Sequence, residues 1–208
     1  KLRARVGERE PERRSKVESL VMRDADAIIV STEEEKQDAV RLYDAHPQKI
    51  EVIPAGVNLD TFKPVNKSIA RQRVGIHEKQ VILYVGRIEP LKGIDVLLKA
   101  AALLDGSDDT RVLIVGGSPG NDAELDRLKA LTTELDIRST VTFTGAIKQN
   151  KLPDYYSAAD VFVLPSHSES FGLAALEAMA CGTPVVVSRV GGLKTFIDNG
   201  ESGYLVPW

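Results

Sequence analysis

Short, mostly apolar segments alternate with helix-forming segments along most of the chain, and this alternation constrains the fold more than any other feature. The mostly apolar segments lie at 81–85, 111–115, 141–144, 161–164, 185–187 and 204–206. Strands that are apolar on both faces are typical of parallel sheets, because helices cover such sheets on both sides. Right-handed crossovers between these strands predict an α/β fold with a doubly wound parallel sheet over residues 67–208.

The N-terminal third of the chain is predicted to be a separate part. Two short strands, at 27–30 and 50–53, flank a helix that begins with a capping box of Thr32 and Glu35. These strands do not obviously join the main sheet. Residues 1–66 are therefore interpreted as the tail of a preceding N-terminal domain plus a connector. The chain opens without Met and in mid-pattern, which indicates a fragment of a larger protein.

In the main part of the chain, helices are predicted at 94–104, 122–135, 152–158 and 172–180, with a helical turn at 194–197. The first of these helices carries its apolar residues on one face.

Composition excludes several classes of protein. Hydrophobic residues make up 43% of the 208 residues and the net charge is −3, which is typical of a globular chain rather than a disordered one. Cys181 is the single cysteine, so a disulfide scaffold and a cysteine-built metal site are excluded, and a reducing, cytoplasmic location is expected. No apolar run approaches the length of about 20 residues that a membrane-spanning helix needs.

The segment 166–182 is the first candidate site. Its helix is apolar or small on every side, so we expect it to be buried, and only Glu177 interrupts it. A buried carboxylate needs a partner, which is either a ligand or a Lys or Arg side chain. Glu169 precedes this helix at the end of the sheet where doubly wound folds bind ligands, although it could serve only as a helix-start carboxylate. The backbone N–H groups of 171–173 suit a phosphate.

The loop 86–93 is the second candidate site. Arg87 follows a predicted strand, and Lys92 lies where the next helix begins. Two cations beside a helix N-terminus form a cradle for a diphosphate. The alternative is that both are solvated surface cations.

Other motifs predict no further chemistry. The chain has neither a GxGxxG nor a GxxxxGK[ST] sequence, which disfavours a nicotinamide-dependent oxidoreductase and a P-loop enzyme. His46, His77 and His167 do not cluster, so no metal site is predicted. The Asp24-Ala25-Asp26 segment is interpreted as a helix-to-strand turn. Acidic residues interrupt the basic segment 1–16, which has no aromatic residue, so it is interpreted as a solvated helix or frayed end and nucleic-acid binding is not expected.

Several motifs occur in a fixed order that resembles a known family. They are 85–87, 92–93, Gly145, 169–173, Glu177, 182–186 and 191–192. Together they resemble the C-terminal, donor-binding half of a family-4 retaining glycosyltransferase, whose GT-B fold has a Rossmann-like domain at this place. Two glutamates with seven residues between them are that family's signature. The segment 52–64 resembles its interdomain connector, although Ala55 stands where Gly is more usual. The similarity is greatest to sucrose-phosphate-synthase-like and mycothiol-type members.

The resemblance implies a role for each matched residue. Arg87 and Lys92 hold the diphosphate of a nucleotide-sugar and stabilise the leaving group. Glu169 contacts the hydroxyls of the donor sugar, while Glu177 bonds the ribose hydroxyls and so gains the partner that its burial requires. The other implied contacts are Gly86, where the sugar approaches, Ile147 and Lys148 in a loop against the base, and the backbone amides of Phe171, Gly172 and Leu173.

The resemblance also implies the reaction. A UDP-linked sugar donates its hexosyl group to an acceptor hydroxyl by a front-face mechanism, in which the leaving diphosphate helps to deprotonate the acceptor. Neither a protein nucleophile nor a metal or other cofactor is required. The acceptor is left open among a sugar, a sugar phosphate, a polyol and a lipid-linked molecule, as is attachment to the inner membrane surface.

The family's acceptor site lies mostly in its N-terminal domain. The isolated chain is therefore expected to need that domain as its partner and to transfer sugar poorly or not at all. Two alternatives are a non-catalytic nucleotide-sugar-binding module and a Rossmann-type NAD-dependent oxidoreductase.

Overall fold

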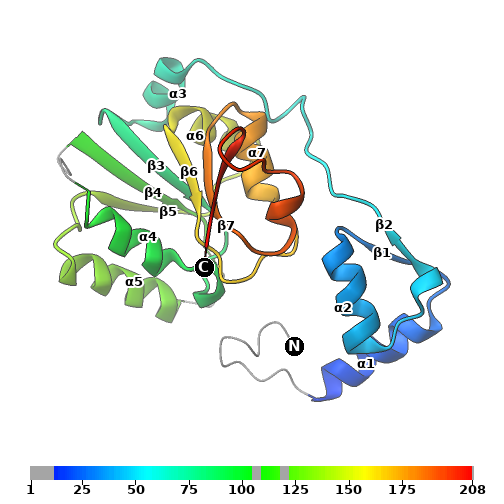
Figure 1. The fold of residues 1–208 in the computed structure, drawn as a ribbon. Helices are drawn as coiled ribbons and strands as arrows, with labels where there is room; N and C mark the ends of the chain where they lie inside the picture. The colour runs from blue at the N-terminus through cyan, green and yellow to red at the C-terminus, as the bar shows by residue number, and fades with distance from the viewer. Residues whose placement is uncertain (1–11, 105–108, 118–121, 208) are drawn as a thin grey trace.

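A parallel sheet forms the centre of the main part of the chain. The computed structural model describes residues 12–104, 109–117 and 122–207 (Figure 1). Within these residues, six strands pair in the order β5-β4-β3-β6-β7-β8, and every pairing is parallel. The strands are β3 (Gln80–Val85), β4 (Thr110–Val115), β5 (Val141–Gly145), β6 (Val161–Leu164), β7 (Val185–Ser188) and β8 (Gly203–Val206). The chain runs outward from β3 on one side and resumes at β6 on the other, so the predicted doubly wound sheet is confirmed.

Helices cover both faces of this sheet, as its apolar strands require. On one face lie α4 (Ile94–Ala101) and α5 (Asp122–Glu134), which pack on each other (Figure 1). On the other face, α6 (Leu152–Ala158) packs on both α3 (Lys67–Val74) and α7 (Leu173–Ala180). Buried side chains of β3 and β4, such as Leu83 and Ile114, form the core between these layers.

The N-terminal residues form a second, smaller part. It contains α1 (Glu12–Asp24), β1 (Ile28–Val30), α2 (Glu33–Tyr43), the 3₁₀ turn η2 (Pro47–Lys49) and β2 (Ile50–Val52). β1 and β2 pair in parallel as a separate two-stranded sheet, and the part has its own cluster of buried side chains. One half of the predicted capping box of α2 is present, since the Glu35 N–H donates to the Thr32 hydroxyl over 3.1 Å. The Glu35 carboxylate accepts from the N–H of Ser31, one residue before the N-cap.

An extended connector joins the two parts (Figure 1). At its beginning, the Ile53 N–H donates to the carbonyl of Val30, which attaches this residue to the small sheet. At its end, the Phe62 N–H donates to the carbonyl of Asn58, and the Phe62 ring lies buried in the main core. The main core therefore takes in residues that precede position 67.

Some elements differ from the sequence predictions. α3 was not predicted, although Asn66 caps it by accepting from the N–H groups of Ser68 and Ile69 and Gly75 ends it with φ +77°. α4 ends at Ala101, three residues earlier than predicted. The helix α1 extends over 12–24, whereas the sequence patterns predict no element over residues 17–23.

Two glycines hold the loops after β3 and β6 against neighbouring backbone. Gly93 has φ +62°, and a Cβ atom there would lie 2.1 Å from the carbonyl oxygen of Pro165. Gly191 begins the 3₁₀ helix η6 (Gly191–Thr195) with φ +48°, and its Cβ would lie 1.6 Å from the carbonyl oxygen of Glu169. Contacts this close exclude any side chain at these two positions, so only glycine allows the backbone conformation of both loops.

A graded series of glycine substitutions tests this packing. Gly93→Ala is expected to lower the free energy of unfolding by about 3 kcal/mol or more, because the left-handed backbone and the clash with Pro165 add together. Gly145 has φ +75° but open space around an added Cβ, so Gly145→Ala is expected to lower the free energy of unfolding by about 1–2 kcal/mol. Gly56→Ala, with neither feature, should change stability by less than about 1 kcal/mol.

Urea titrations followed by circular dichroism measure all three variants. Equal losses for Gly93→Ala and Gly145→Ala would contradict the proposed contact with Pro165.

Candidate functional site

A cleft of about 590 Å³ opens beyond the carboxyl ends of β3 and β6. Between these two strands the order in which the chain adds strands to the sheet reverses, and ligands of doubly wound folds bind at this point. The main part contributes Arg87, Lys92 and Glu169 to the lining, and the small part contributes residues of α1, β1 and α2. The three residues that the sequence predicts as catalytic thus line one cavity, although they are up to 82 positions apart.

Lys92 and Glu169 form an ion pair within this cleft. The Lys92 Nζ donates to Glu169 Oε2 over 2.7 Å, and the two side chains are only 13% and 15% exposed. The hydroxyl of Ser166 also lies 3.4 Å from the same carboxylate oxygen. Backbone bonds keep the two loops together, because the His167 N–H donates to the carbonyl of Leu91. The pair is therefore held at a fixed place, and its two charges offset each other.

Arg87 reaches into solvent at the edge of the cleft. Its side chain is 60% exposed, and its Nη1 donates to Glu89 Oε1 over 2.7 Å. The loop beneath it is fixed by the buried Tyr84 hydroxyl, which donates to the carbonyl of Arg87. Burial, followed by the nearby Glu169 and Glu89 carboxylates, raises the pKa of Tyr84, so this phenol stays a donor.

Gly86 lies against that same hydroxyl. A Cβ at this position would lie 2.7 Å from the Tyr84 oxygen. The position of the Tyr84 hydroxyl thus favours glycine at position 86, because a side chain there would displace it.

The loop before α7 presents unpaired backbone donors. Among the described residues, no acceptor bonds the N–H groups of Phe171, Gly172 or Leu173. Gly172 has φ +97°, and the Gly192 N–H donates to the carbonyl of Ser170, which fixes the loop. Unpaired backbone N–H groups at the first turn of a helix suit an anion.

The expectation that α7 is buried on every side is wrong. Leu173 is 47% exposed, and only Ala175 and Ala178 are fully buried within the helix. α7 packs against α6, β6 and β7 on one side, which leaves its other side open. Glu177 is consequently half-buried rather than enclosed.

Glu177 has a protein partner that is neither Lys nor Arg. The Tyr156 hydroxyl of α6 donates to Glu177 Oε2 over 2.7 Å. Burial raises the pKa of Glu177 above that of an ordinary glutamate, and the bond from Tyr156 partly opposes this rise. The sequence shows no spacing that pairs these residues, because they come from different helices.

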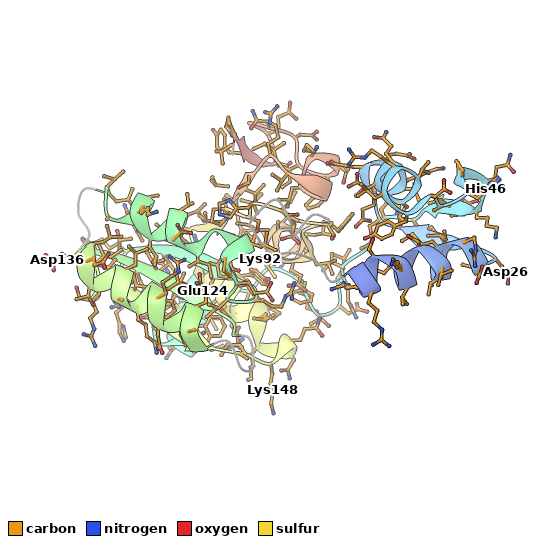
Figure 2. All side chains as sticks on the ribbon, turned by 90° about the horizontal axis from the view of Figure 1, so that it is seen from below. Asp26, His46, Lys92, Glu124, Asp136 and Lys148 are labelled. Carbon is orange, nitrogen blue, oxygen red and sulfur yellow. The ribbon has the colours of Figure 1, made fainter. Side chains whose placement is uncertain are left out.

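The remaining predicted residues, Ile147 and Lys148, follow β5 at the same edge of the sheet but do not line the cleft. Lys148 is exposed and points away from the body of the molecule (Figure 2). The structure therefore gathers Arg87, Lys92 and Glu169, and leaves Glu177 and the loop after β5 at separate positions along the sheet edge.

Residues of the small part also line the cleft, and sequence reasoning missed them. Arg14 and Glu18 of α1 form an ion pair over 2.8 Å there, and Ser31 and Glu35 lie beside them. The sequence predicts a solvated helix or frayed end for the segment 1–16, because acidic residues interrupt its basic ones and it has no aromatic residue. No pattern within one helix could show that a loop more than 70 residues later lies opposite.

Metal-binding features are absent from the part of the chain that the structure describes. No three residues among its His, Cys, Asp and Glu side chains gather as a metal site, and none of its helices is long and apolar enough to cross a membrane. Asp24 ends α1 and Asp26 precedes β1, as the predicted turn requires. Asp26 and His46 lie at the far end of the small part from Lys92 (Figure 2).

Comparison with known proteins identifies the family. Residues 66–207 match the family described as Glycosyl transferases group 1. The chain belongs to this family. The predicted resemblance is thus confirmed, and the α/β Rossmann-like sheet agrees with it.

Relatives of known name share the sequence over almost the whole chain. D-inositol 3-phosphate glycosyltransferase 2 of Catenulispora acidiphila is 47% identical over 204 residues, which are 95% of this chain and 48% of the relative. D-inositol 3-phosphate glycosyltransferase of Frankia alni is 45% identical over 209 residues, which are 97% of this chain and 51% of the relative. The chain spans about half the length of these glycosyl transferases.

Solved structures agree with the fold. Sucrose-phosphate synthase of Thermosynechococcus elongatus superposes with a TM-score of 0.86 at 39% identity, over 96% of this chain and 49% of that protein. Anabaena HepE in complex with UDP and glucose also gives a TM-score of 0.86, at 25% identity, over 95% of this chain and 54% of that protein. The fold is that of one half of a GT-B glycosyltransferase.

Cys181, at the end of α7, is expected to be chemically inert. Burial, and then the nearby Glu177 carboxylate, raises the pKa of its thiol to about 12. At pH 8 the reactive thiolate is therefore scarce, and iodoacetamide should label less than about one tenth of the native chain in an hour. Mass spectrometry reads this directly, because the chain has a single cysteine. Complete labelling in 8 M urea is the control, and equally fast labelling of native protein would refute the expectation.

Proposed function

We propose that this chain is the donor-binding half of a retaining glycosyltransferase that uses a UDP-linked sugar. The observation that carries the proposal is the convergence of Arg87, Lys92 and Glu169 on one cleft at the carboxyl ends of β3 and β6. Two cations beside unpaired backbone N–H groups match the charge and geometry of a diphosphate. Support for UDP comes from HepE, whose structures contain UDP and UDP-glucose.

In this proposal each residue binds a particular group of the donor. Arg87 and Lys92 stabilise the negative charge that grows on the β-phosphate as its bond to the sugar breaks. Glu169 orients Lys92 and accepts from hydroxyls of the sugar, and Glu177 accepts from hydroxyls of the ribose. Ile147 and Lys148 lie on the side of the base.

The proposed chemical step needs no protein nucleophile. The bond between the anomeric carbon and the β-phosphate oxygen breaks, and the acceptor oxygen bonds the same carbon on the same face. The acceptor proton passes to the leaving phosphate. Positioning and charge stabilisation are therefore the contributions of the protein, and the two cations supply the positive charge without requiring a metal.

The acceptor is proposed to be a phosphorylated polyol. Relatives that are 45–47% identical are named for D-inositol 3-phosphate. Arg14 supports this choice, because its guanidinium, which also pairs with Glu18, lines the cleft from the small part. A guanidinium binds a phosphate through two parallel hydrogen bonds.

Calorimetric titration of the chain tests the donor site. UDP is expected to bind more tightly than GDP, ADP or NADH. Glu177→Ala and Lys92→Ala should each weaken UDP binding about tenfold, since each removes a charge-assisted hydrogen bond. Lys99→Ala is the matched control, because Lys99 is an exposed lysine of α4 that pairs with Asp95 outside the cleft. Preferential binding of NADH would indicate an oxidoreductase, and binding of no nucleotide would refute a preformed donor site.

Transfer is tested with a longer protein that includes the N-terminal half found in the relatives. With UDP-sugars and D-inositol 3-phosphate, the product is expected to keep the α configuration of the donor, which proton NMR reads from the anomeric coupling. The 208-residue chain alone should turn over at least about a hundredfold more slowly, because positioning of the acceptor is lost. Inverted product would refute the front-face mechanism, and UDP-sugar binding without transfer to any acceptor would favour a non-catalytic module.

A further inference from the structure

The hydroxyl of Tyr156 makes a hydrogen bond, although the ring that carries it is surrounded by apolar side chains. The side chain is fully buried, between Phe62 of the connector and Phe162 of β6. The ring centroids lie 6.1 Å and 5.8 Å away, and both neighbours meet it edge to face. In such a place phenylalanine would pack equally well, so the hydroxyl needs a separate reason.

The hydroxyl is directed at the carboxylate of Glu177. It donates to Oε2 over 2.7 Å, and among the described residues no other bond reaches either oxygen of this carboxylate. Oε1 is therefore available at the half-buried side of α7. A glutamate side chain has three rotatable bonds, so a fixed donor on one oxygen restricts the direction of the other.

We propose that Tyr156 is a positioning residue that holds Oε2 of Glu177 so that Oε1 faces the ribose diol of the nucleotide donor. The inference rests on the proposed function, in which Glu177 binds the ribose. It adds a specificity role to a residue that touches no substrate. Tyr156 makes the site selective for a ribonucleotide over a deoxyribonucleotide, because only a correctly directed carboxylate accepts from the 2′-hydroxyl.

The backbone of Tyr156 is anchored as firmly as its ring. The Thr183 hydroxyl donates to the Tyr156 carbonyl over 2.6 Å, just beyond the end of α7. One residue thus joins α6, the segment after α7 and the connector. Since α6 and α7 are fixed to each other at this point, the position of the hydroxyl relative to Glu177 is determined by the fold.

Titration with UDP and 2′-deoxy-UDP tests the proposal. The wild-type chain should bind UDP about tenfold more tightly, as expected for one charge-assisted hydrogen bond. Tyr156→Phe should reduce this preference to less than about threefold by weakening UDP while leaving 2′-deoxy-UDP nearly unchanged. Tyr155→Phe is the matched control, because it removes a hydroxyl from the preceding residue of α6 and should keep the full preference.

The pH dependence separates positioning from mere packing. Tyr156 of α6 and Cys181, which follows α7, are the titratable groups that interact with Glu177 among the described residues. Donation from Tyr156 favours the charged carboxylate and so lowers the pKa of Glu177. Without that donor the carboxylate protonates at a higher pH. The pH below which UDP binding weakens should therefore move upward in Tyr156→Phe and stay in place in Tyr155→Phe.

A double variant keeps the test decisive if Tyr156→Phe alone does not fold. In a Glu177→Ala background the carboxylate is already absent, so Tyr156 has nothing left to position. Adding Tyr156→Phe should therefore change the UDP affinity less than twofold relative to Glu177→Ala alone. A further loss of about tenfold would show that Tyr156 acts independently and would overturn the inference.

The proposed function and this inference fail in different ways. Absence of UDP binding by the wild-type chain refutes the proposed function. Normal UDP binding that Glu177→Ala weakens, with an unchanged ribose preference in Tyr156→Phe, refutes only the positioning role.

Discussion

The short pairing between β3 and β6 is the constraint on which the rest of the structure depends. β3 pairs with β4 at six positions but with β6 at only two, Ile82 with Val161 and Leu83 with Phe162. Beyond these positions the two strands lead into loops that are bonded to each other, since the His167 N–H donates to the carbonyl of Leu91. The gap in which the cleft opens lies beyond these joined loops, and the crossovers on opposite faces keep any helix from filling it. The position of the cavity thus depends on the reversal of strand order between β3 and β6 and not on any particular residue.

The glycines then determine which groups line that gap. Gly93 and Gly191 permit backbone contacts that fix the two loops, and the loops bring Lys92 to within 2.7 Å of Glu169. An ion pair at this depth loses hydration and gains attraction, and the two effects nearly cancel. Its value therefore lies in fixing side chains in place more than in stabilising the fold. A ligand with both phosphate and hydroxyl groups can engage both members at once.

Sequence patterns predicted the sheet well, because buried parallel strands are short and apolar on both faces and helix-forming segments separate them. They failed where structure depends on contacts between distant segments. The helix Lys67–Val74 is mostly polar, so its apolar stripe is too weak to recognise, although Asn66 and Gly75 mark both of its ends. For the site, motif order singled out Arg87, Lys92 and Glu169, and these three residues line one cavity. The Tyr156 donor and the lining of the small part lie beyond such reasoning, because both depend on packing between separate elements.

The connector between the two parts has a mechanical consequence. Ile53 is bonded to the small sheet, whereas Val57 already packs on the main core and the turn at Asn58–Phe62 continues it. Only Pro54, Ala55 and Gly56 lie between these anchors, and proline has a fixed φ. Any swing of one part against the other is thus concentrated in ψ of Pro54 and in the dihedral angles of Ala55 and Gly56. Such a hinge spans about 10 Å, so it permits rotation that widens or narrows the cleft but little sliding of the two parts.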